Sequence, residues 1–136
     1  MDAWAALLVK HEIVTMNVNI AGPTPSGGAS SYRNINLLAT GQVIKSEPGK
    51  LCTVHAWNGH ATDARYLKIY DKATEADQNN TPKLTVPLKA LTWTRFDLGL
   101  GADFTAGIGV RATTELADNG TTAPGANEIT INVTYK

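Results

Sequence analysis

Apolar and polar residues alternate with a period of two along most of the chain, which is typical of β-strands with one buried face. The clearest unit is LCTVHAWNGHATDARYLKIY, residues 51–70, in which two apolar runs of strand length flank the polar segment 58–64. β-Branched and aromatic residues dominate both runs and favour strand over helix. In the second run Leu67 and Ile69 would share one face, opposite the two tyrosines and the lysine. We expect this strand–turn–strand unit to form the centre of a sheet.

Further alternating segments predict the other strands. They are residues 12–20, 34–46, 84–88, 91–98, 108–114 and 129–135. Pro87 cannot donate a hydrogen bond to a ladder, so its strand is expected at a sheet edge. The intervening segments carry Gly, Pro or many polar residues and are expected to be loops or turns. These loop segments are residues 21–33, 71–83, 99–107 and 115–128.

About eight short strands, with no helix predicted after residue 10, indicate an all-β fold, an antiparallel β-sandwich. The only cysteine, Cys52, is expected in a buried strand, and the immunoglobulin cysteine pair is therefore absent. We predict a jelly-roll-like sandwich, although the pattern alone does not separate this strand order from an immunoglobulin-like one.

The first twelve residues are predicted to form an N-terminal arm, and residues 13–136 a single β-sandwich domain. Apolar side chains of the arm fall on one face of a short helix, which is marginal alone in water and must pack on this domain or on a neighbouring molecule. The Pro- and Gly-rich loop 21–33 would also reach outward, anchored at its far end by a tyrosine. The predicted partner-interface residues are Trp4, Leu7, Leu8, Pro23, Pro25 and Tyr32.

The charge and hydropathy of the chain argue against nucleic acid and membranes as partners. Twelve basic and twelve acidic residues cancel among 136, and charged residues make up 18% of the chain. No net field would therefore steer the protein to nucleic acid or to an anionic membrane. No apolar run reaches the length of a membrane span, and the start lacks the basic region of a signal peptide. We expect synthesis in a cytoplasm.

No constellation of reactive residues predicts catalysis, a cofactor or a metal site. The two histidines of HAWNGH, His55 and His60, are followed by Asp63, but their spacing matches no usual zinc pattern. A calcium ion shared by Asp97 and Asp103 is a weaker interpretation than two turn-forming acids. We therefore expect the protein not to be an enzyme. Catalysis is kept as the least favoured hypothesis, for which the sequence suggests no residues.

Four aromatic residues allow two interpretations. They are Trp57, Tyr66, Tyr70 and Trp93. They could form a platform on which a sugar stacks, or they could pack in the core and between the sheets. Strand periodicity favours the packing interpretation.

With these strands defined, the chain resembles small β-sandwich virion structural proteins of tailed bacteriophages, of the capsid decoration (cement) or head-fibre type. The stretches that carry the resemblance are GQVIKSEPGKLCTVHAWN (41–58), ARYLKIYDKATEAD (64–77), TPKLTVPL (81–88), FTAGIGVRATTELADNGTT (104–122) and ITINVTYK (129–136). The resemblance covers residues 14–136 and is a pattern of strands and turns. It contains no catalytic or ligand-binding motif.

The resemblance implies a non-enzymatic protein on the capsid surface of a virion, made in the host bacterial cytoplasm. Its expected role is to bind the lattice of the major capsid protein, or other virion proteins, and to stabilise the head, with the protein itself a homo-oligomer. Many copies of the protein, each bound weakly, would together bind the lattice strongly through multivalency. The alternative is a carbohydrate- or receptor-binding module of a phage tail or fibre.

Overall fold

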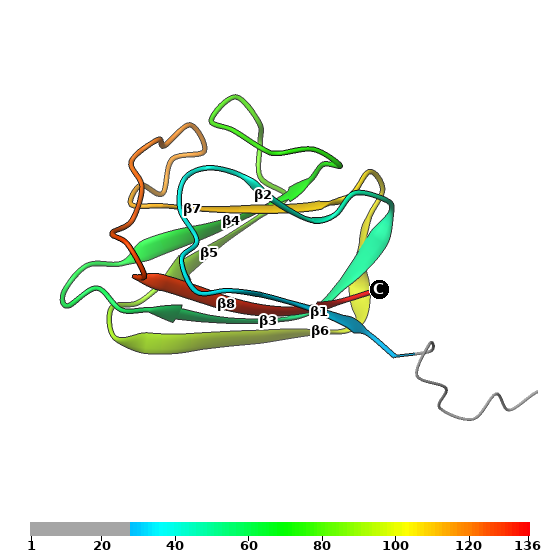
Figure 1. The fold of residues 1–136 in the computed structure, drawn as a ribbon, viewed down its shortest axis with the longest axis horizontal. Coiled ribbons are helices and arrows are strands. Elements are labelled where there is room, and N and C mark those ends of the chain that lie inside the picture. Colours follow the sequence, from blue (N-terminus) through cyan, green and yellow to red (C-terminus); the bar gives the residue numbers. More distant parts are fainter. Residues whose placement is uncertain (1–27) are drawn as a thin grey trace, which may run out of the picture.

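The computed structural model describes residues 28–136 (Figure 1). This part of the chain contains eight β-strands. They are β1 (Ser30–Asn34), β2 (Gln42–Lys45), β3 (Gly49–Asn58), β4 (Arg65–Asp71), β5 (Leu84–Leu88), β6 (Thr92–Phe104), β7 (Ile108–Thr113) and β8 (Ile129–Tyr135). Within the described residues no helix is long and apolar enough to cross a membrane.

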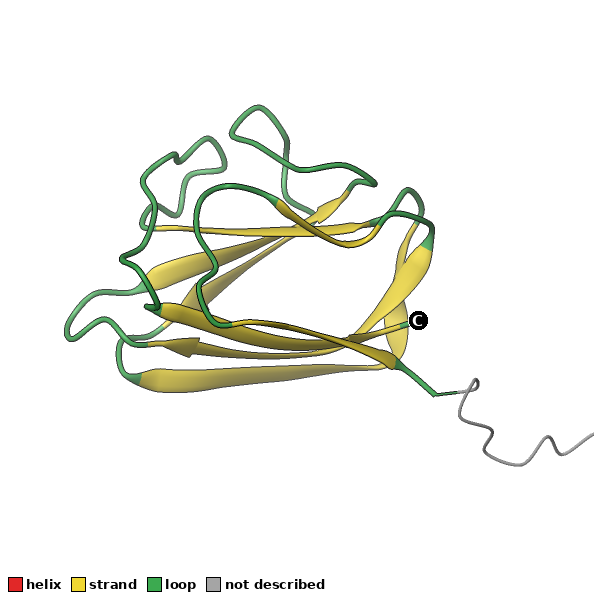
Figure 2. Cartoon of the chain, in the orientation of Figure 1, coloured by secondary structure: helices red, strands yellow, loops and turns green. Residues whose placement is uncertain are grey.

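The strands form two antiparallel four-stranded sheets that lie face to face (Figure 2). Sheet A has the order β1-β8-β3-β6, and sheet B has the order β2-β7-β4-β5. The chain changes sheet at every connection except the one from β4 to β5. This is the strand order of a jelly roll. An immunoglobulin-like order would pair the first strand with the second, whereas here they lie in different sheets. The predicted all-β, jelly-roll-like sandwich is confirmed.

The sequence predicted that the stretch 51–70 forms the centre of one sheet. In the structure its two strands lie in different sheets. Strand β3 lies between β8 and β6 in sheet A, and β4 lies between β7 and β5 in sheet B. Each run is therefore an interior strand of its own sheet, and residues 59–64 cross from one sheet to the other. The alternation within a strand fixes which residues share a face, but it does not reveal the partner strand.

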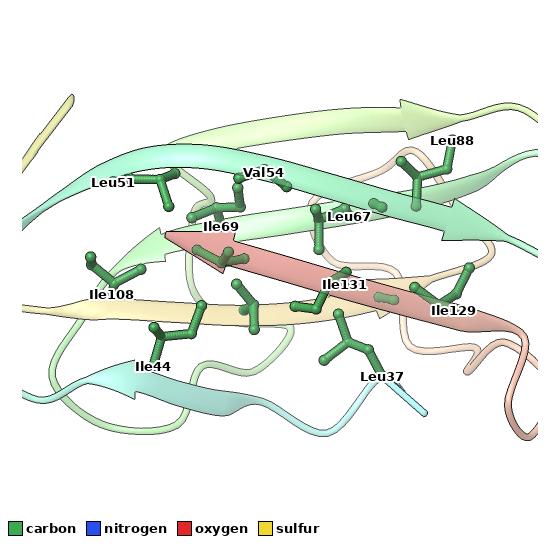
Figure 3. Close-up of a cluster of buried hydrophobic side chains, with 14 of the residues drawn as sticks. Leu37, Ile44, Leu51, Val54, Leu67, Ile69, Leu88, Ile108, Ile129 and Ile131 are labelled. Atoms are coloured by element: carbon green, nitrogen blue, oxygen red, sulfur yellow. The ribbon is translucent and has the colours of Figure 1, made fainter. Parts of the chain in front are cut away.

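The core fills the space between the two sheets (Figure 3). Val54 and Ala56 point inward from β3, and Leu67 and Ile69, which the alternation placed on one shared face, point inward from β4. Strands β7 and β8 contribute a further set of β-branched residues, and Cys52 is buried, as expected. The burial of one face of each sheet against the other supplies the main favourable free energy of this fold.

Several boundaries differ from those the sequence predicted. Pro87 lies in edge strand β5, as expected, but β6 continues to Phe104 where a turn was predicted from residue 99. Gly99 and Gly101 adopt φ angles of 61° and 104° within that strand, a backbone conformation that glycine adopts without steric cost. Residues 30–33, predicted as loop, belong to β1. The predicted strand 12–20 and the arm 1–12 lie outside the described residues.

A buried ion pair and a buried amide fasten one end of the sandwich. Nε of Arg65, at the start of β4, lies 2.7 Å from Oε2 of Glu128, immediately before β8. The Asn58 side chain donates to the carbonyl oxygens of Asp63 at 3.0 Å and Leu88 at 2.8 Å. These contacts connect the crossing segment 59–64 to both sheets. They also fix the position of the C-terminal end of β3, next to its outward side chains.

Candidate functional site

The outer face of sheet A is exposed over all four of its strands, and we call it the open face. Its side chains alternate with the inward core residues of the same strands. They are Ser31 and Arg33 of β1; Thr130, Asn132 and Thr134 of β8; Thr53, His55 and Trp57 of β3; and Trp93, Arg95 and Asp97 of β6. Figure 2 shows the long loops gathered on the opposite side, over sheet B.

Three aromatic rings form the apolar part of the open face. The antiparallel register places Trp57 opposite Trp93 and His55 opposite Arg95. The ring centroids of Trp57 and Trp93 lie 5.6 Å apart, and those of His55 and Trp93 lie 4.5 Å apart. Such cross-strand aromatic pairs stabilise a sheet and hold each ring in place. Trp93 is nevertheless 47% exposed, so this cluster presents a large apolar surface to solvent.

A cavity of about 350 Å³ lies beside the aromatic cluster and has lining residues on all four strands. Its lining residues are Ser31, Tyr32, Arg33, Thr53, His55, Arg95, Asn132, Val133 and Thr134. Two guanidinium groups and an amide supply hydrogen-bond donors, while no carboxylate is among the described residues that line it. The open face therefore combines an apolar platform with cationic donors, an arrangement that suits it to binding.

The predicted packing of the aromatic residues is wrong for the two tryptophans. Trp57 and Trp93 point away from the inter-sheet core, because Val54 and Ala56 occupy the inward positions of β3. Tyr70 is buried, but it too lies on the outward side of its strand, under the loops over sheet B. The period-two pattern predicted which residues share a side, and it could not tell which side faces the other sheet.

The histidine and acid pairs considered for metal binding do not form a cluster. His60 Nδ1 accepts hydrogen bonds from the backbone N–H groups of Thr62 and Asp63, at 3.2 and 2.8 Å. Asp103 pairs with the ammonium group of Lys50 at 2.6 Å. Asp97 accepts from the N–H of Gly99 at 2.9 Å. No group of three metal-ligating side chains occurs within residues 28–136.

The predicted partner-interface residues fall mostly outside the described part of the chain. Trp4, Leu7, Leu8, Pro23 and Pro25 all precede residue 28. Tyr32 lies in β1, where it is partly buried against the core. The interface role of all six residues stays a prediction.

The outer face of sheet B differs, and we call it the covered face: Lys68 and Tyr70 of β4, and Gly109, Arg111 and Thr113 of β7. All five residues are buried beneath the loops 72–83 and 114–128. Lys68 donates to the carbonyl oxygen of Ala117, and Arg111 donates to that of Gly120. Sequence analysis missed this burial, because a strand reading Tyr-Leu-Lys-Ile-Tyr looks like one with a solvated outer face.

Burial changes the protonation equilibria on the covered face. Desolvation lowers the pKa of Lys68, and the neighbouring positive charge of Arg111 lowers it further. Desolvation raises the pKa of Tyr70, while the charge of Arg111 opposes that shift. The covered face therefore holds two cationic side chains where a charge is costly.

Comparisons of the chain with models of protein families, with curated proteins and with solved structures found no match.

Proposed function

We propose that the chain is a non-enzymatic structural protein of a tailed-bacteriophage virion, a capsid decoration protein that binds the major capsid protein lattice and stabilises the head. The sequence resemblance supplies the virion context. The stretches that carry it fall on β2, β3, β4, β5, β7 and β8 and on the turns between them. Jelly rolls occur in viral capsid proteins and in lectins alike, so the fold by itself does not decide the function.

The observation that carries the proposal is the exposed aromatic and cationic surface of the open face. Trp and Arg are enriched among the residues that contribute most to protein–protein binding. Here Trp93 and Arg95 project from edge strand β6, and Arg33 projects from the opposite edge strand β1 of the same sheet. Side chains held by a regular sheet lose less entropy on docking than side chains of a flexible segment. The proposed partner surface is a capsid lattice, whose many equivalent sites would convert a weak contact into stable coverage.

Reconstitution on particles tests this function. Heads assembled without the protein are mixed with the purified full chain, and bound protein is measured after sedimentation together with the temperature at which the heads release their DNA. We expect saturable uptake and a higher release temperature. The variant Trp93→Ala/Arg95→Ala should reduce uptake at least tenfold, about 1.4 kcal/mol.

A matched control distinguishes loss of the open face from loss of any exposed apolar residue. Leu116 is 62% exposed in the loop between β7 and β8, on the side of the covered face. Leu116→Ala should bind heads as the unmodified chain does. Equal uptake by the open-face variant and the unmodified chain would contradict docking through the open face, and no saturable uptake at all would contradict the proposed function.

The alternative, a carbohydrate- or receptor-binding module of a tail or fibre, is favoured by one feature of the same surface. The tilted Trp57–Trp93 pair lies beside a cavity lined by Asn132 and two arginines. Sugars stack an apolar face on aromatic rings while their hydroxyls pair with such polar groups. A glycan array probed with the chain and with Trp93→Ala tests this. Binding that depends on Trp93, together with no uptake by heads, would favour the alternative.

A further inference from the structure

A second cavity, of about 390 Å³, opens on the side of the covered face, whereas the first cavity opens on the outer face of sheet A. Three segments that precede or follow strands of sheet B form its walls: residues 39–41, residues 75–78 and Thr121. Arg111 of β7 also lines it and is 1% exposed. The cavity is thus walled by loops, and Arg111 lies at its base beneath them.

The guanidinium group of Arg111 has more donors than the described residues satisfy. Arginine carries five N–H donors. Nη2 donates to the carbonyl oxygen of Gly120, and Nη1 lies 3.5 Å from the hydroxyl of Tyr70, a long contact. Nε is buried and has no hydrogen-bond partner among residues 28–136. A buried donor without a partner costs about 1–3 kcal/mol, so an acceptor brought close to this group would stabilise it.

The charge balance below the loops also favours the binding of an anion. Lys68 is fully buried on the neighbouring strand β4 and, like Arg111, forms no ion pair with a carboxylate among the described residues. Its ammonium group donates to the carbonyl oxygen of Ala117. Two buried cations held only by neutral oxygens and more distant acids are unfavourable, because desolvation of each charge is not offset by a counter-ion.

The acids that line the cavity restrict the kind of anion. Glu75 and Asp77, both exposed, are part of the lining. A phosphate dianion would be repelled by these two carboxylates. A monoanionic carboxylate carries half that charge and pairs well with a guanidinium group. Hydroxyl or ammonium groups elsewhere on the same ligand could donate to Glu75 and Asp77.

We propose that this cavity binds a small organic carboxylate that also carries hydrogen-bond donors, with the carboxylate directed to Arg111 and the donors directed to Glu75 and Asp77. A sugar acid and an amino acid both supply this chemistry. The site lies on sheet B, so it stands apart from the open face and does not depend on the proposed virion role.

Titrations of the full chain, followed by calorimetry and by two-dimensional amide NMR at constant ionic strength, test the site. The probes are sodium glucuronate, sodium glutamate, sodium phosphate and sodium chloride. We expect glucuronate or glutamate to bind saturably and to shift the amide signals of residues 39–41, 75–78 and 121. Arg111→Gln should weaken that binding at least about tenfold.

Two further variants keep the test decisive if Arg111→Gln fails to fold. Thr121→Trp places a bulky ring at an exposed position of the cavity wall and should abolish binding while the other amide signals stay unchanged. Arg95→Gln removes an arginine from the open-face cavity and should leave binding unchanged. Glucuronate binding alone identifies a sugar-acid site, and glutamate binding alone an amino-acid site. Binding of neither, equal binding of phosphate or chloride, or unaltered binding by Thr121→Trp would overturn the proposal.

Discussion

The two sheets are built from the same alternating pattern, yet their outer faces have opposite environments. On sheet A the outward residues, including Trp93 and Arg95, remain open to solvent. On sheet B the outward residues Lys68, Tyr70 and Arg111 are almost completely buried. Figure 1 shows why, because the loops after β4 and β7 fold over sheet B, and within residues 28–136 no such loop crosses the outside of sheet A.

Because of this difference, we expect the covered face to contribute to stability and the open face to contribute to binding. The covered face holds polar side chains under loops, where each unpaired donor costs stability unless an acceptor reaches it. The open face keeps its apolar and cationic groups accessible, which costs some exposed apolar area and leaves a surface for a partner. Substitutions on the covered side should therefore change the free energy of unfolding, whereas those on the open side should change binding.

The largest effect is expected where a loop approaches the sheet too closely for any side chain. A Cβ atom at Gly107 would lie 2.6 Å from the carbonyl oxygen of Lys45 and 2.8 Å from Cα of Ala73. Both contacts are backbone atoms, so Gly107→Ala must displace the start of loop 72–83 from β7. We expect a loss of about 3 kcal/mol in the free energy of unfolding, measured by urea denaturation.

The matched control is two residues further along. A Cβ atom at Gly109 would approach no atom closer than 3.6 Å, which is ordinary contact. Gly109→Ala should therefore leave the free energy of unfolding unchanged or raise it by about 0.5 kcal/mol. An equal decrease in the free energy of unfolding for Gly107→Ala and Gly109→Ala would contradict the idea that close packing of a loop on sheet B stabilises the covered side.

An intermediate effect is expected at Asp71, which joins the end of β4 to the turn between β6 and β7. Its carboxylate accepts from the N–H groups of Ala106 at 2.8 Å and Thr105 at 3.0 Å, and from the Thr105 hydroxyl at 2.9 Å. These bonds lower the pKa of Asp71 to about 2. Asp71→Asn should cost about 2 kcal/mol at neutral pH, because hydrogen bonds to a charged acceptor are lost.

The pH dependence of this loss has a defined sign. The folded-state pKa of Asp71 is depressed, so its contribution is complete above the unfolded value near 3.8 and is lost as the pH falls through about 2. Urea midpoints of the unmodified chain and of Asp71→Asn should converge between pH 4 and pH 2, an interval that follows from those two pKa values. A gap that stays constant over this interval would contradict the assignment. Asp97→Asn, on the open face, should cost less than about 0.5 kcal/mol at neutral pH.

Sequence reasoning predicted the parts of this fold that depend on local pattern. The shared face of Leu67 and Ile69, the edge position of Pro87 and the all-β sandwich follow from period-two alternation and from the chemistry of proline. The strand order of the jelly roll does not follow from them. Sequence reasoning missed properties that depend on long-range pairing. The register that brings Trp57 beside Trp93, and the loops that bury Lys68, join residues far apart in sequence, and no local signal encodes them.

A large deletion on the open face is expected to change the free energy of unfolding less than a conservative substitution on the covered face. Trp93→Thr removes a half-exposed indole from a strand that already carries threonines, so it should cost less than about 1 kcal/mol. Tyr70→Phe removes only an oxygen, but that oxygen faces Arg111 in a buried site, so about 1.5 kcal/mol should be lost. If the larger deletion proves the costlier one, then the indole of Trp93 is part of the folding core, and the open face is less free to bind a partner than its exposure indicates.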